Sequence, residues 1–168
     1  MTAKAQAPRL VMAASAVVFL IATATIVAAL GFEHFGRYAP CPLCLQQRYA
    51  YYFAVPASAV AFVLAQGQSP RLARILLVLI AIAFAANVVA GVYHSGIEWK
   101  WWEGPATCAG ETPIEWGEGG LGEQLANAQI IRCDEAPWRF LGLSFAGWSA
   151  VVSALLAGVA AWGASKRS

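Results

Sequence analysis

The sequence has few charged residues. Only 12% of its 168 residues are Asp, Glu, Lys or Arg, whereas 60% are hydrophobic. A soluble domain of this size usually carries about twice that share of charge. The shortage argues against a soluble globular protein and favours a membrane protein. The basic residues also form no stripe along the sequence, so we expect no nucleic-acid partner.

Charge is absent from four long stretches, each close to the roughly 20 apolar residues that a helix needs to cross a bilayer. These are Leu10–Leu30, Tyr49–Ala65, Ile75–Tyr93 and Phe140–Ser165. The first stretch is too long for the apolar core of a cleaved signal peptide. The sequence therefore predicts an all-α membrane protein, a single domain over residues 1–168 that forms a bundle of four transmembrane helices. The expected spans are about 10–30, 45–65, 75–93 and 143–163.

Acidic residues are missing from one side of this predicted bundle. All nine lie in the two loops that connect spans one to two and three to four, about residues 31–44 and 94–142. Cytoplasmic segments of membrane proteins are enriched in Lys and Arg. The chain termini and the turn between spans two and three are therefore predicted to be cytoplasmic, because all of their charged residues are basic. These residues are Lys4, Arg9, Arg71, Arg74, Lys166 and Arg167.

The second outer loop has features of its own. Residues 122–131 have the apolar spacing of a short helix lying on the membrane surface. The stretch from Gly104 to Pro113 holds two prolines and two glycines and is expected to be extended. Tryptophans gather in this loop, and we interpret them as interfacial anchors: Trp99, Trp101, Trp102, Trp116 and Trp138.

Cysteine is absent from the predicted spans and from the cytoplasmic side. Cys41 and Cys44 lie in the first outer loop, and Cys108 and Cys133 lie in the second. An even number of cysteines confined to one face indicates disulfide chemistry in an oxidising compartment, because cytosolic thiols are kept reduced.

The first pair lies where a helix is expected to start. Pro42 suits the first helical position, so Cys44 would fall in the first turn, where the helix dipole lowers a thiol pKa. Arg48, at i+4 from Cys44, would lower that pKa further and could hold a polar ligand oxygen. The alternatives are a static bridge or a C-x-x-C half of a zinc site. Zinc needs another close ligand pair, and the two histidines flank neither pair of cysteines, so we expect no metal.

The second pair, by itself, suits a structural bridge, since closing about 25 residues contributes roughly 3–4 kcal/mol. Beside the first pair, however, Cys108 and Cys133 can take part in thiol–disulfide exchange, and the electrons then need an acceptor. The sequence has no dinucleotide fingerprint and no C-x-x-C-H haem attachment motif. A lipid-soluble quinone is the simplest acceptor. A haem held by His34 and His94, which end spans one and three, is the rival.

These residues resemble the disulfide bond formation protein B (DsbB) family of bacterial inner membranes. The shared motifs extend over nearly the whole chain: "ALGFEHFGRYAPCPLC", the arginine four positions after the second cysteine, "YHSG", "PATC" and "CDEAPWRFLGL". The resemblance implies a multi-pass inner-membrane thiol:quinone oxidoreductase with periplasmic cysteine loops. Its partners would be a periplasmic DsbA-like thioredoxin-fold protein and ubiquinone or a similar membrane quinone.

The resemblance also implies a role for each cysteine. The reduced partner would attack the Cys108–Cys133 bridge and form a mixed disulfide with Cys108. Cys133 would then reach Cys41 and free Cys44 as a thiolate beside the quinone. The sequence leaves open whether the resting bridges are these two pairs or a crossed Cys41–Cys133 form.

Two further residues are assigned through the same resemblance. Arg48 would help to hold the quinone and stabilise its charge, and His94 would lie near it. Two other functions stay open. One is a non-enzymatic four-span scaffold braced by two structural disulfides, and the other is the same machinery run backward as a quinol-dependent reductase.

Overall fold

The structure is a computed structural model that describes residues 3–105 and 132–165. Four long helices make up the bundle: α1 (Ala3–His34), α2 (Pro42–Val63), α3 (Pro70–Glu98) and α5 (Phe145–Ser165). All four are long and apolar enough to cross a membrane. The predicted fold class, an all-α bundle of four membrane-spanning helices, is confirmed. The surface helix expected over residues 122–131 lies outside the described residues.

The helices extend beyond the uncharged stretches of the sequence. The first span runs over Pro8–His34 and the third over Pro70–Glu98. The helical hydrogen-bond ladder continues into polar flanks because Lys, Arg and Glu are good helix formers. Helix α2 continues past Pro56 and leads into a π-helical turn, η1 (Leu64–Gln68), in which Gly67 has a φ of 128°. This turn joins α2 to α3.

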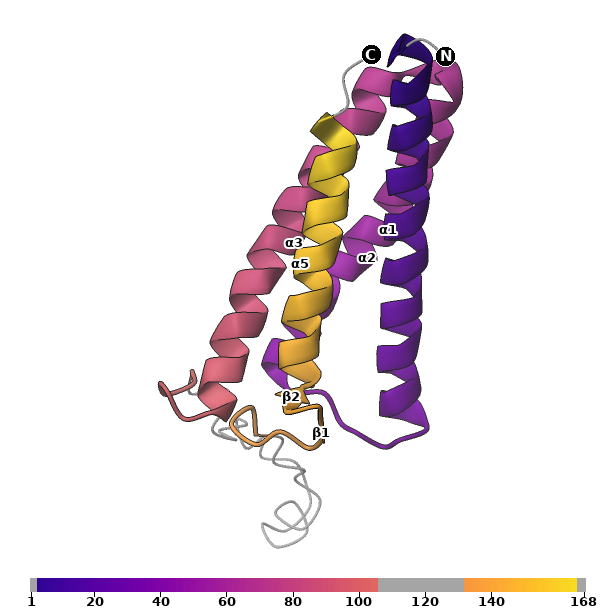
Figure 1. The fold of residues 1–168 in the computed structure, drawn as a ribbon. Coiled ribbons are helices and arrows are strands. Elements are labelled where there is room, and N and C mark those ends of the chain that lie inside the picture. Colours follow the sequence, from indigo (N-terminus) through magenta and orange to yellow (C-terminus); the bar gives the residue numbers. More distant parts are fainter. Residues whose placement is uncertain (1–2, 106–131, 166–168) are drawn as a thin grey trace, which may run out of the picture.

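The helices form a ring in which α1 contacts α2, α2 contacts α3, α3 contacts α5 and α5 contacts α1 (Figure 1). Helix α1 begins, and α5 ends, at one end of the bundle, while the loops that hold the described cysteines lie at the other. A hairpin of β1 (Arg139–Phe140) and β2 (Leu143–Ser144) precedes α5, and its turn residues Leu141 and Gly142 both have positive φ, as a type I′ turn requires.

Many small side chains lie in the centre of the bundle beside Leu77, Ile80 and Phe84, and many large ones face outward. Ala54, Ala61 and Ala160 are fully buried, whereas Leu20 and Val89 are more than half exposed. This distribution suits a lipid environment, where burial of large apolar groups gives no advantage and close helix contact does. Asn87 donates to the Ser153 hydroxyl at 2.9 Å and so links α3 to α5 within the bundle. Lipid-facing apolar surface and interhelical polar contacts both indicate a membrane-embedded bundle.

The second loop is tied to the end of α3 close to Cys133. Lys100 forms an ion pair with Asp134, and the Arg132 Nη2 lies 2.9 Å from the same carboxylate. These two cations hold the pKa of the Asp134 carboxyl well below its usual range, through the hydrogen bond from Arg132 first and that from Lys100 second. The exposed pairs contribute little stability, but they fix the position of the chain beside Cys133.

Candidate functional site

Cys41 and Cys44 lie together at the start of α2. Cys41 is the N-cap, Pro42 occupies the first turn, and the Cys44 backbone N–H donates to the Cys41 Sγ at 3.2 Å. Both cysteines are free, and their sulfur atoms are 2.7 Å apart and share a hydrogen bond. A sulfur atom thus makes the capping contact that a serine or aspartate oxygen usually makes at a helix start.

Besides the contact between the two sulfur atoms, Cys41 accepts from the Cys44 N–H and is approached by His94. The pKa of Cys41 is lowered from about 9 to about 5, first by its hydrogen bond with the Cys44 side chain and then by His94 and the Cys44 N–H, against the opposing effect of burial. The sequence predicts Cys44 as the favoured thiolate. The geometry favours Cys41 in the free pair, because the N-cap sulfur accepts from the Cys44 N–H and contacts His94.

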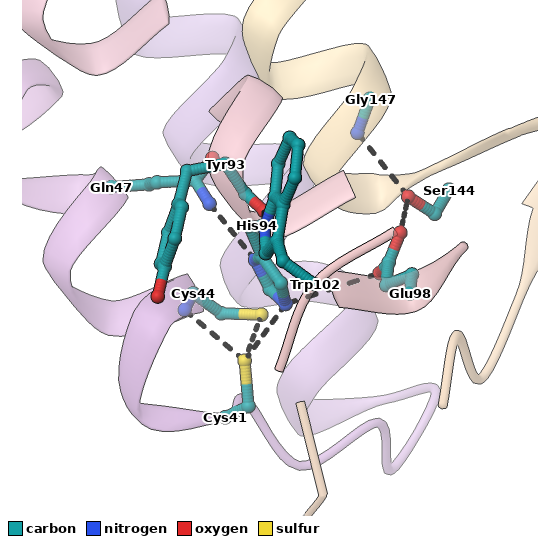
Figure 2. A network of polar contacts seen from close by, with 9 residues as sticks. All are labelled: Cys41, Cys44, Gln47, Tyr93, His94, Glu98, Trp102, Ser144 and Gly147. Atoms are coloured by element: carbon teal, nitrogen blue, oxygen red, sulfur yellow. Dashed lines mark hydrogen bonds and ion pairs between the residues drawn. The ribbon is translucent and has the colours of Figure 1, made fainter. Parts of the chain in front are cut away.

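His94 approaches the pair from α3 (Figure 2). Its Nε2 lies 3.6 Å from the Cys41 Sγ, and its Nδ1 lies 3.0 Å from the Gln47 Nε2. The ring is only 2% exposed. A histidine that is 53 positions from Cys41 in the sequence therefore lies in direct contact with it. Sequence spacing, which places neither histidine beside a cysteine pair, does not reveal this contact.

Cys133 completes the group of sulfur atoms. It is 1% exposed and forms one buried cluster with Cys41, which is 4% exposed, with Leu43 and Cys44 packed against them. Cys133 is disulfide-bonded. Cys108 lies outside the described residues. The structure thus brings one cysteine of the second loop against the first pair.

Arg48 projects from α2 one turn after Cys44, as its spacing predicts, and is bound by a carboxylate that the sequence does not point to. The Arg48 Nη1 donates to the Glu33 Oε2 at 2.5 Å, joining α2 to the end of α1. The Arg48 side chain is 13% exposed and that of Glu33 is 27% exposed. The cation is therefore partly neutralised in this structure.

A cavity of about 710 Å³ lies beside these groups. Cys41, Cys44, Arg48 and His94 all line it, on the side of α2 and α3. Small apolar residues of α1, among them Ala24 and Ala28, and residues of α5 line the rest. A mostly apolar pocket with a few convergent polar groups is typical of a small-molecule site. Its chemistry suits a flat, apolar ligand that carries polar oxygens.

A chain of polar contacts extends from His94 to α5. The Glu98 Oε1 lies 4.0 Å from the His94 Nε2, and the Ser144 hydroxyl donates to the other Glu98 oxygen. Ser144 also accepts from the Gly147 N–H at 3.2 Å, which makes it the N-terminal cap of α5 (Figure 2). The start of α5 is thereby connected to the end of α3 and to the cysteine pair.

Comparison with known proteins assigns the chain. The family model described as "Disulfide bond formation protein DsbB" matches residues 11–163, which include nearly all of the four helices and the cysteine cluster. The chain belongs to the DsbB family. Membership indicates a multi-pass membrane protein with disulfide-forming oxidoreductase activity.

Relatives of this DsbB-family chain are moderately similar. A disulfide bond formation protein B of Marinobacter nauticus is 32% identical over 142 residues, which cover 83% of each chain. A protein of the same name from Xanthomonas oryzae pv. oryzae is 30% identical over 137 residues, 75% of this chain and 72% of its own. An uncharacterized protein of Rickettsia prowazekii is 25% identical over 126 residues, 74% of this chain and 70% of its own. No solved structure gives a significant match.

Several residues of this DsbB-family site are not predicted from the sequence. Gln47, Glu98, Glu33 and Ser144 all contact an assigned residue or one of its partners. A weak signal exists for two of them, since Gln47 is at i+3 from Cys44 and Glu98 is at i+4 from His94, on the same helical faces. His94 lines the cavity, whereas His34 is exposed at the end of α1 and does not line it, so the described geometry does not support the haem pair.

Proposed function

We propose that this DsbB-family chain generates disulfides de novo as a thiol:quinone oxidoreductase of a bacterial inner membrane. It would oxidise a periplasmic DsbA-like thioredoxin-fold dithiol and pass two electrons through its two cysteine pairs to ubiquinone or a similar quinone. The observation that carries the proposal is the burial of Cys133 against Cys41, beside the cavity that Cys44 and Arg48 line. Exchange between the two loops requires that contact.

The resemblance to the family implies the thiol steps, and the contact of Cys133 with Cys41 supports the exchange between the two pairs. A partner thiolate attacks Cys108 and breaks the Cys108–Cys133 bond, which releases Cys133 as a thiolate. Cys133 then attacks Cys41 of an oxidised first pair, and Cys44 leaves as a thiolate beside the cavity. The partner's second thiol resolves the mixed disulfide, so that the partner gains one disulfide bond and loses two electrons and two protons.

The surroundings of Cys41 favour re-formation of the Cys108–Cys133 bridge. When Cys108 attacks Cys133, the Cys41 sulfur is the leaving group. A thiol of lower pKa leaves faster. The hydrogen bonds from the Cys44 N–H and from His94 support the departing negative charge on Cys41. This arrangement favours return of the crossed intermediate to the two original pairs.

The residues around the cavity fit a quinone. A quinone supplies the two-electron, two-proton acceptor chemistry. Arg48 offers a donor and a positive charge to a quinone oxygen on the side of Cys44, and the alanines of α1 offer an apolar surface to a ring and an isoprenoid chain. His94 contacts Cys41 and lines the same cavity, so it is positioned to move a proton between the thiols and the cavity.

The proposed orientation rests on charge. The end of the bundle where α1 begins and α5 ends holds basic residues without acids, which suits the cytoplasmic side. The cysteine loops at the opposite end would then face the periplasm. That compartment is kept oxidising by a DsbA–DsbB–quinone relay, which is an established property of bacterial periplasms and of this same family.

The deciding experiment mixes the detergent-purified protein with a reduced thioredoxin-fold dithiol protein and a soluble ubiquinone analogue. We expect quinone loss to match new partner disulfide one for one. Cys44→Ser should abolish quinone reduction. Cys108→Ser should block turnover with the partner while the first pair, reduced chemically, still reacts with quinone. Full turnover in either variant would contradict the scheme, and no quinone loss with folded protein would favour the braced scaffold.

A further inference from the structure

Three potential metal ligands meet at the start of α2. The Sγ atoms of Cys41 and Cys44 and a ring nitrogen of His94 all lie within 4.8 Å of one another. Among the described residues this is the only such group of three. Cys41 and His94 are buried, and Cys44 is half-buried, so the ligands are held by the packing of α2 against α3 (Figure 2).

The distances suit tetrahedral zinc. With Zn–S of about 2.3 Å and Zn–N of about 2.0–2.1 Å, the S···N edge of a tetrahedral site is about 3.6 Å and the S···S edge about 3.8 Å. The Cys41 Sγ to His94 Nε2 distance is already 3.6 Å. The two sulfur atoms, now 2.7 Å apart, would need to separate by roughly 1 Å when the ion binds.

An unpartnered polar atom supports the same site. Gln47 is 4% exposed, and its Oε1 is buried without a hydrogen-bond partner, while its Nε2 faces the His94 Nδ1. If the amide turns over, Oε1 accepts from an Nδ1–H, and the lone pair of Nε2 is then directed at the two sulfur atoms. Metal-bound histidines generally have an outer partner of this kind on the second nitrogen. In this arrangement Oε1 gains the Nδ1–H donor, and Nε2 takes the position that Oε1 has in the free state.

Charge and access are also suitable. Two thiolates and a neutral imidazole balance the charge of one divalent cation, and the Glu98 carboxylate lies 4.0 Å from the His94 Nε2. All three ligands line the cavity, which gives the ion an access route and leaves a fourth position for water. Sulfur and imidazole ligands in a tetrahedral arrangement select zinc over magnesium or calcium.

We propose that the reduced Cys41–Cys44 pair and His94 form a Zn²⁺ site with Gln47 as the outer partner of the histidine. The oxidised pair cannot bind, because a disulfide offers no thiolate. Zinc therefore captures only the reduced enzyme and blocks both sulfur atoms. The binding stands on the ligand geometry alone, whereas its consequence, inhibition of electron transfer, rests on the proposed function.

The test titrates Co²⁺, a spectroscopic substitute for Zn²⁺, into the reduced, detergent-purified full chain carrying Cys108→Ser and Cys133→Ser. We expect thiolate-to-cobalt charge-transfer bands and the visible bands of tetrahedral cobalt, saturating at one ion per chain and lost on addition of one equivalent of Zn²⁺. The same protein with its first pair oxidised should give no bands. Absence of the bands in the reduced protein would overturn the proposal.

Matched variants test the ligand set. His94→Ala should weaken Zn²⁺ binding by more than the 10–100-fold that loss of an outer-shell partner causes, and Gln47→Leu should weaken it by about 10-fold or more. His34→Ala changes the other, exposed histidine and should leave binding unchanged. Unchanged affinity in both His94→Ala and Gln47→Leu, each checked for helix content, would show that the dithiol alone binds the metal and would refute the site.

Inhibition is measured separately. Zn²⁺ should stop quinone reduction by the reduced wild-type enzyme, and a chelator should restore it. Because the cobalt titration uses neither quinone nor partner, the two proposals fail independently. Metal binding without any quinone reduction would refute the proposed function alone, and quinone reduction without metal binding would refute the zinc site alone.

Discussion

The Arg48 guanidinium donates to the Glu33 carboxylate at 2.5 Å, so the cation beside the candidate quinone cavity has an anionic partner from the end of α1. The Glu33 carboxylate already compensates part of the Arg48 charge. Arg48 therefore stabilises negative charge on a bound oxygen less than it would without this partner. Glu33 therefore sets how much of the positive charge is available to a ligand.

Glu33→Gln should speed quinone reduction. Glutamine keeps a hydrogen-bond acceptor that positions Arg48 but removes the opposing charge, which for a partly exposed pair is worth roughly 0.5–1 kcal/mol, or about 2–5-fold in rate. Single-turnover absorbance of a ubiquinone analogue, mixed with the pre-reduced protein, measures the rate. In the Arg48→Gln background the effect of Glu33→Gln should disappear. A slower reaction in Glu33→Gln alone would show that the carboxylate acts by orientation and not by charge.

Alkylation of Cys41 should depend on pH with a midpoint near its lowered pKa. Since that pKa is about 5 and the thiolate is the nucleophile, the rate constant should be constant above about pH 6 and fall below pH 5. Cys44→Ala removes the largest cause of the lowering, so the midpoint should move upward toward 9. Iodoacetamide labelling of reduced protein, with mass-spectrometric assignment of the labelled cysteine, gives both profiles. Identical profiles would contradict the role of the Cys44 hydrogen bond.

Gly163→Ala should destabilise the bundle. A Cβ at Gly163 would lie 2.4 Å from the Ala14 Cβ and 3.0 Å from a Leu77 methyl, so α5 would have to move away from its neighbours. Overpacking of this kind costs about 1–3 kcal/mol. Gly158→Ala is the matched control, because nothing lies within 4 Å of a Cβ there. Unfolding of both variants in detergent, followed by circular dichroism, should separate them, and equal stability would show that this contact adjusts without cost.

Ser144→Ala should also destabilise the protein, by about 1–2 kcal/mol, since it removes the cap of α5 and leaves the buried Glu98 oxygen without its donor. Ser165→Ala, at the exposed far end of the same helix, removes only a bond to the Trp162 carbonyl and should have little effect. Chemical unfolding of the two variants under the same conditions compares them. A Ser144→Ala variant as stable as Ser165→Ala would mean that water replaces the lost hydroxyl.

The sequence predicts the helices well and the contacts between them poorly. Length and hydrophobicity define each span, because a bilayer imposes them residue by residue. The start of α2 is also predictable, since the preference of proline for the first turn is local. The position of Arg48 on the face of Cys44 follows from helical spacing alone.

Contacts between helices cannot be predicted from such local sequence patterns. The approach of His94 to Cys41 depends on how α3 is rotated against α2, and the pairing of Glu33 with Arg48 depends on the path of residues 35–41. Neither rotation nor path is encoded in a local pattern. The sequence also assigns the favoured thiolate to Cys44, whereas Cys41 accepts from the Cys44 N–H, which is a local cap contact, and is approached by His94, which is a tertiary contact.

The burial of Cys41 and Cys133 in one cluster has a further consequence, which is protection from exchange with dissolved thiols. Glutathione is a tripeptide and far larger than iodoacetamide, so it has little access to the sulfur atoms of residues that are 4% and 1% exposed. Cys41 and Cys133 are therefore shielded from direct reaction with glutathione. Under the proposed function, the redox state of these sulfur atoms would then depend on the protein partner that exchanges disulfides with the second pair.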